Sequence, residues 1–169
     1  GVALEIADGD AAAADGTLHV ADAWGRVRSL GAGGAVIGER TSEGFVGLGV
    51  AAGAGEIYVT EALTRAIGVL SRSSASVEPH ERLRIADAPS AWPVDVALGV
   101  DGRLYAAGGD NGRVDVIDPR THAATSWPSG GSGVERIDAA LAGTVLARGY
   151  GGIQAVFTAE CAVESEWRP

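Results

Sequence analysis

The sequence predicts an all-β fold built from four small antiparallel sheets, and three observations support this prediction. Short runs alternate between apolar and polar residues, which is the pattern of half-buried strands. The same phrase, a glycine followed by such a run, a tight turn and a second run, occurs four times. Its anchor glycines are Gly16, Gly55, Gly102 and Gly143, so the repeats step by 39, 47 and 41 residues. This period is typical of a four-stranded blade, and the sequence therefore predicts a β-propeller.

The strands of each repeat are predicted to run from the propeller axis outwards. Small apolar runs form the inner strands, within 9–16, 45–52, 94–100 and 135–141. The second strand follows the anchor glycine, and in the first repeat Leu18 and Val20 alternate with polar neighbours. The third strands are expected to begin at Val27, Ile67, Val114 and Ile153. The segment 60–70 has a helix-like composition, but its place in the repeat predicts a strand, a turn and a strand.

The outer strands are predicted in more polar runs, within 35–42, 76–85, 123–129 and 162–169. Charged residues and prolines in these runs, such as Glu39, Arg40 and Pro128, are expected to discourage edge-to-edge pairing.

The whole chain, 1–169, is predicted to be one propeller domain. Its approximate repeats are 9–42, 43–88, 89–130 and 131–169. Residues 1–8 resemble an outer strand, which belongs either to a preceding blade or to a blade that closes the ring. Two arrangements therefore stay open: a closed ring of four blades, or a section of a larger propeller.

The composition excludes several classes of protein. Hydrophobic residues make up 46% of the 169 residues, too many for a disordered chain. The longest apolar runs are much shorter than a bilayer-spanning segment, so no direct membrane insertion is expected. The net charge of −9, without a single lysine, argues against binding to nucleic acid or to anionic membranes. The one cysteine cannot form an internal disulfide and fits any compartment.

The third repeat, "PVDVALGVDGRLYAAGGDNGRVDVIDP", resembles an NHL repeat. The matching positions are Pro93, Asp101, Gly102, Leu104, Tyr105, Asn111, Arg113 and Val114. The first repeat matches the second half of that pattern through Val20, Ala21, Asp22, Arg26 and Val27. The match is loose in the fourth repeat, and Gly108 stands where NHL repeats usually have Asp.

The second repeat, "IYVTEALTRAIGVL", resembles the blades of streptogramin B lyases and related YVTN-type propellers. These resemblances imply the propeller fold, but the superfamily includes sensors, scaffolds, gluconolactonase-like enzymes and lyases. Its extracytoplasmic sensor domains slightly favour a location outside the cytoplasm, although the sequence itself leaves the compartment open.

Carboxylates recur where the second strands end. Asp22 and Glu61 occupy the same position in their repeats, and Asp110 lies near the corresponding point of the third. Oxygen ligands converging on one rim are suited to Ca²⁺, and lactonase-like propellers also use an Asn ligand, for which Asn111 is the only candidate. The alternative interpretation, which we favour, is that these side chains cap the following turns and pair with nearby arginines. We therefore expect no cofactor, with Ca²⁺ as the alternative.

Aromatic residues give a second set of candidates. Trp24 is expected in a turn and Trp92 just before an inner strand, both on a face where ligands dock. His19, Tyr58, Tyr105 and Leu146 share another repeat position, for which we expect packing between blades.

These features predict a non-catalytic binding or sensing module for a protein, glycan or small-molecule ligand. The first alternative is a metal-assisted lactonase or lyase that uses Asp22, Glu61, Asp110 and His19. The second is a structural segment of a larger propeller.

Overall fold

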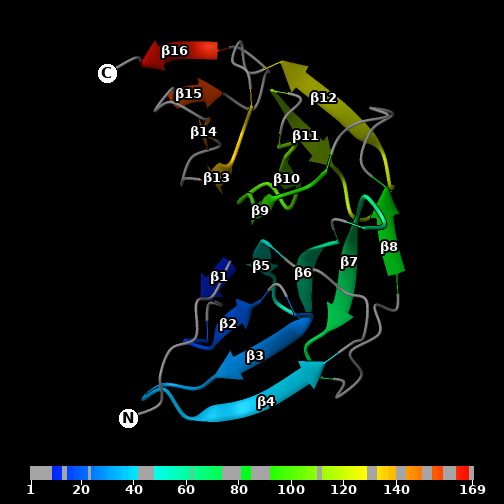
Figure 1. Cartoon of the computed structure of the whole chain (residues 1–169), viewed down its shortest axis with the longest axis vertical. Coiled ribbons are helices and arrows are strands. Elements are labelled where there is room, and N and C mark those ends of the chain that lie inside the picture. The colour runs from blue at the N-terminus through cyan, green and yellow to red at the C-terminus, as the bar shows by residue number, and fades with distance from the viewer. Residues whose placement is uncertain are drawn as a thin grey trace. The chain divides into compact units, whose positions relative to one another are not determined.

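The computed structural model is built from β-strands, as the sequence predicts (Figure 1). The structure describes residues 9–12, 15–22, 24–41, 48–61, 63–73, 81–84, 92–109, 112–128, 133–139, 144–149, 154–157 and 163–167. The proposed outer strand at 1–8 lies outside them. The strands form four antiparallel four-stranded sheets, each in chain order from inner to outer strand. The predicted fold class, a β-propeller with four-stranded blades, is thus confirmed.

The strands of each sheet come from one of the predicted repeats. The first sheet contains β1 (Gly9–Ala12), β2 (Leu18–Ala21), β3 (Arg26–Leu30) and β4 (Val36–Thr41). The second contains β5 (Val50–Ala52), β6 (Glu56–Glu61), β7 (Ala66–Ser71) and β8 (Glu81–Arg84). The third contains β9 (Asp95–Leu98), β10 (Leu104–Ala107), β11 (Arg113–Ile117) and β12 (Ala124–Pro128). The fourth contains β13 (Arg136–Ala139), β14 (Val145–Arg148), β15 (Gln154–Phe157) and β16 (Val163–Trp167).

The chain divides into two compact units, which we call the N-terminal unit (Gly1–Arg82) and the C-terminal unit (Leu83–Pro169). In the N-terminal unit the inner strands β1 and β5 lie together. Apolar side chains of the first two sheets form its core: Ala21, Val27, Val50, Ile57, Val59 and Leu70. Their small and branched shapes explain how a chain with few aromatic residues fills the space between two sheets.

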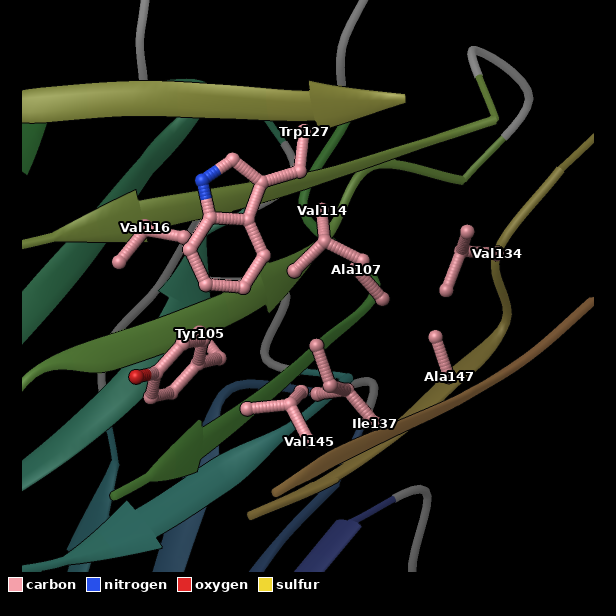
Figure 2. Packing of buried hydrophobic residues seen from close by; sticks show 9 residues of the cluster. All are labelled: Tyr105, Ala107, Val114, Val116, Trp127, Val134, Ile137, Val145 and Ala147. Carbon is pink, nitrogen blue, oxygen red and sulfur yellow. The ribbon is translucent and has the colours of Figure 1, made fainter. Parts of the chain in front are cut away.

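The C-terminal unit has a larger core between the third and fourth sheets (Figure 2). Tyr105 and Trp127 meet there with ring centroids 5.7 Å apart and planes tilted by 58°. Trp127 packs in one cluster with residues of the fourth sheet, including Ile137 and Val145. Trp127 therefore packs across the two sheets of this unit.

Burial differs between the sheets. Side chains of β6 and β10 are buried on both faces, whereas β14 alternates between buried and exposed and β2 between buried and half-buried. Thr60 is one of the polar residues in a buried strand, and its hydroxyl oxygen accepts hydrogen bonds from the backbone N–H groups of Leu48 and Gly49, at 3.1 and 2.8 Å. These bonds attach the chain just before β5 to β6.

One outer-strand expectation is wrong. Arg40 does not guard the edge of β4, because its side chain is buried and donates a hydrogen bond from Nη2 to the backbone oxygen of Arg72 at 3.2 Å. Glu39 and Pro128, from the same expectation, are exposed. The register explains the difference, because Arg40 pairs with Val27, whose side chain faces the core, while Glu39 faces the other way.

Candidate functional site

Asp22 organises the turn between β2 and β3. Its Oδ1 accepts hydrogen bonds from the backbone N–H groups of Trp24 and Arg26, at 2.9 and 3.1 Å. Its Oδ2 lies 2.7 Å from Nε of Arg26 and forms an ion pair. The backbone N–H of Gly25, with φ of 82°, donates to the carbonyl of Asp22 at 3.1 Å. Asp22 therefore makes the turn-capping contacts of the favoured interpretation.

The environment of Asp22 acts on its pKa in two directions. Burial raises the pKa of this carboxyl, because a charged group loses solvation. The N–H donors of Arg26 and Trp24 and the Arg26 guanidinium outweigh burial, so the pKa lies below its ordinary value. Asp22 is thus a carboxylate at neutral pH, and both of its oxygens are engaged by the turn.

Glu61 has the same place at the end of β6 and is 3% exposed. Its Oε2 accepts a hydrogen bond from the hydroxyl of Thr64 at 2.6 Å and lies 2.7 Å from Nε of Arg82. Arg82 comes from the outer strand β8, and its side chain is about half exposed. Glu61 therefore joins the β6–β7 turn to the edge of its own sheet.

Two large apolar side chains project from these turns. Trp24 and Leu63 both stand eight residues after the anchor glycine of their repeats, and they are 71% and 68% exposed. In a propeller the blades repeat around one axis, so the equivalent turns of these two packed sheets lie at the same end of the unit. We call this set, Asp22, Trp24, Glu61 and Leu63, the turn end of the N-terminal unit.

The corresponding part of the C-terminal unit is described only in part. Trp92 is 54% exposed, and its backbone lies beside the β10–β11 turn, where a Cβ on Gly109 would approach its carbonyl oxygen to 3.2 Å. Asp110 and Asn111, two of the predicted rim residues, lie outside the described residues. The structure therefore places Asp22 and Glu61 at equivalent turns of the N-terminal unit. It places Trp92 beside the β10–β11 turn of the C-terminal unit.

His19 lies away from the turn end, inside the N-terminal unit. It is 2% exposed, and its Nδ1 is 2.9 Å from the hydroxyl oxygen of Ser29. Burial, and then the charges of Arg72 and Arg40, lower the pKa of His19, so the ring is neutral at pH 7. Tyr58 and Tyr105 at the same repeat position are buried too. The burial of these three residues agrees with the expected packing between blades. The expectation is wrong for Leu146, which is 43% exposed because it lies on the open face of β14.

Two polar groups with partners far away in the sequence were not found by the analysis of motifs. Asp95 in β9 accepts hydrogen bonds from the backbone N–H groups of Val96 and Ile137, at 3.0 and 2.9 Å, and so ties β9 to β13. Arg72 follows β7 and forms an ion pair with Asp15 in the β1–β2 turn, at 2.5 Å. The signal for Asp95 was present in the sequence, as a lone carboxylate in an apolar inner strand. Nothing local marks Arg72, because its partner is 57 residues away.

The described residues contain no group of three or more His, Cys, Asp or Glu side chains arranged to hold a metal ion. Within the same residues, no helix is long and apolar enough to span a bilayer.

Comparisons with known proteins identify the fold but no family. The sequence matches no family model and no curated protein. Among solved structures, the chain is similar to hydrazine synthase of Kuenenia stuttgartiensis, with a TM-score of 0.78, 18% identity and coverage of 98% of this chain and 51% of that one. It is also similar to a catalytically inactive virginiamycin B lyase from Staphylococcus aureus with quinupristin, with a TM-score of 0.75, 17% identity and coverage of 95% and 54%.

A further match is a streptogramin B lyase, with a TM-score of 0.77 and 16% identity, which covers 94% of this chain and 53% of that one. The chain therefore spans about half the length of the solved proteins that it matches. At these identities the likeness concerns the fold, and it includes proteins of different activities. The chain has the fold of a β-propeller, as its repeats predicted.

Proposed function

We propose that this chain is a non-catalytic binding module and that the turn end of the N-terminal unit contacts the ligand. The observation that carries this proposal is the exposure of Trp24 and Leu63 at equivalent positions of two neighbouring turns. Large apolar side chains in such a place are suited to anchoring a partner, because burying them releases their surface from water. Asp22 and Glu61 support this role, because their hydrogen bonds hold the turns that carry Trp24 and Leu63.

The chemistry of this surface fits a segment of another protein. A tryptophan and a leucine fit apolar side chains of a peptide. The contacts of Asp22 and Glu61 also favour binding over metal-assisted catalysis. A metal ion that used these carboxylates would have to displace Arg26 and Arg82 from them.

The test is a selection of peptides from a random library on the unmodified chain, followed by affinity measurements on variants. Trp24→Ser and Leu63→Ser should each weaken binding by about tenfold or more, which is the effect of removing a central anchor. The matched control is Val100→Ser, which removes an equally exposed apolar side chain from the C-terminal unit and should leave affinity unchanged.

Equal affinity of the three variants would contradict the proposal. If the chain instead binds glycans, and this binding depends on Trp24 but not on Leu63, we would conclude that the ligand is a sugar and not a peptide.

A further inference from the structure

Two buried polar side chains lie between the first and second sheets of the N-terminal unit. His19 in β2 and Arg40 in β4 are 2% and 8% exposed. Pairing places Arg40 beside Val27, which belongs with Ala21 to the core between these two sheets. His19 lies two residues before Ala21 on the same strand and therefore points to the same side. Both side chains thus face the second sheet.

Each of these side chains has one nitrogen without a hydrogen-bond partner. Nη2 of Arg40 donates to the backbone oxygen of Arg72, whereas Nη1 has no partner in the described part of the chain. Nδ1 of His19 is 2.9 Å from the hydroxyl oxygen of Ser29, whereas Nε2 has no partner among the same residues. When the Ser29 hydroxyl donates to Nδ1, the ring proton is on Nε2. Both nitrogens are then buried N–H donors that require an acceptor.

The charge of Arg40 also lacks a counter-charge. Among the described residues, no carboxylate lies within ion-pair distance of its guanidinium. Asp15, the carboxylate whose charge acts on His19, is paired with Arg72. Burial lowers the pKa of Arg40, because a charged group loses solvation, but a guanidinium keeps its proton in proteins. A buried charge without a partner is costly, so this arrangement favours a negative ion from solution.

The first sheet leaves space on this side for a small ion. Gly38 pairs with Ser29, which pairs with His19, so all three positions lie on the same side of the sheet. Among the described residues, a Cβ added to Gly38 would have only side-chain atoms of Ser29 within 4 Å, and none from the second sheet. Gly38 is half-buried and stands in the outer strand, so this space lies close to solvent.

We propose that the N-terminal unit binds a small anion of single charge, such as chloride, between its first two sheets, held by Nη1 of Arg40 and Nε2 of His19. A monovalent ion balances the one guanidinium that lacks a counter-charge. The net charge of −9 opposes anion binding at long range, but salt screening at physiological ionic strength limits this effect to about 8 Å. The bound ion links β2 to β4 across β3.

The first test compares thermal unfolding in sodium chloride with unfolding in sodium gluconate, a salt of a bulky anion, at equal ionic strength. The melting temperature of the unmodified chain should rise with chloride concentration, because an ion that binds only the folded state stabilises it. Arg40→Met keeps an apolar stem without the charge and should lose this rise. Arg28→Met is the matched control and should keep it, since Arg28 is already paired with Glu39. A melting temperature that does not depend on chloride, or an equal rise in Arg40→Met, would overturn the proposal.

The second test uses the unmodified chain, so it does not depend on the folding of a variant. The chloride NMR line should broaden in the presence of the protein, and an excess of nitrate should narrow it again by competition. The imidazole signals of His19 should shift as chloride is added, and the pKa of His19 should rise, because the ion offsets the charges of Arg40 and Arg72.

A chloride line that stays narrow, or a His19 signal that does not respond to chloride, would overturn the assignment of this site. None of these residues belongs to the turn end, so the results are independent of the peptide-binding proposal.

Discussion

At the scale of single residues, the close packing beside the β9–β10 turn leaves no room for a side chain at one glycine. A Cβ on Gly99 would lie 2.5 Å from Oδ1 of Asp101 and 2.7 Å from Cε2 of Tyr105. These two side chains are fixed by a hydrogen bond of 2.9 Å from the tyrosine hydroxyl to the aspartate, and Tyr105 is fully buried. The ring therefore has little room to move away.

We expect Gly99→Ala to lower the free energy of unfolding by about 1–3 kcal/mol, the usual cost of overpacking. Urea denaturation followed by circular dichroism measures it. Gly55→Ala is the control, since no atom lies within 4 Å of its added Cβ. Equal stability of the two variants would show that the turn adapts and that the contacts of Gly99 are not limiting.

At the scale of strands, Asp95 makes the link between β9 and β13 sensitive to pH. Burial is the main cause that raises the pKa of this carboxyl from 3.8 to about 6, although two N–H donors favour its charged form. In the unfolded chain the carboxyl loses its proton near its ordinary pKa, while in the folded chain it keeps it until about pH 6. Asp95 therefore stabilises the fold most at low pH, and this contribution is lost as the pH rises from about 4 to 6.

The loss amounts to about 3 kcal/mol, because each pKa unit corresponds to about 1.4 kcal/mol. Asp95→Asn has no charge to titrate, so the difference in unfolding free energy between the unmodified chain and this variant should change by that amount between pH 4 and pH 7. Chemical denaturation at a series of pH values measures it. If this difference in unfolding free energy is the same at every pH, Asp95 is not the source of the pH dependence.

The N-terminal unit contains an ion pair whose contribution to stability changes with pH in the opposite direction. The backbone N–H of Thr17, and then the Arg72 side chain, lower the pKa of Asp15 from 3.8 to about 2. The ion pair between the β1–β2 turn and the residue after β7 is thus fully present above about pH 4 and is lost as the pH falls through 2.

Asp15→Asn should therefore destabilise the chain at neutral pH and match it in strong acid. Denaturation at neutral pH and at about pH 2 tests this expectation. The same loss of unfolding free energy at both pH values would instead indicate a packing role for Asp15.

At the scale of the whole molecule, the contacts of the carboxylates support the proposed binding module over the metal-assisted alternative. Asp22 and Glu61 hold their turns through N–H, hydroxyl and guanidinium donors. We therefore expect Ca²⁺ or Mg²⁺ to leave the melting temperature unchanged in a calorimetric scan. A tight metal site would raise it, because an ion that binds only the folded state adds a few kcal/mol at saturation. A clear shift that Asp22→Asn abolishes would favour the metal-assisted alternative.

The repeats and the positions of their strands could be predicted from local patterns in the sequence. Alternation with a period of two and the recurring glycine turns are local signals, and they were sufficient to locate all four strands of each sheet. The capping role of Asp22 was also predictable, because its partners Trp24 and Arg26 lie within four residues of it.

Which faces and side chains are buried could be learned only from the packing of the sheets in three dimensions. It placed Arg40 in the interior, gave Glu61 the partner Arg82, and joined Asp95 to Ile137, 42 residues away. Alternation shows that a strand has two different faces, but it does not show which sheet covers each of them. That choice depends on residues far apart in the chain, and local alternation contains no information about them.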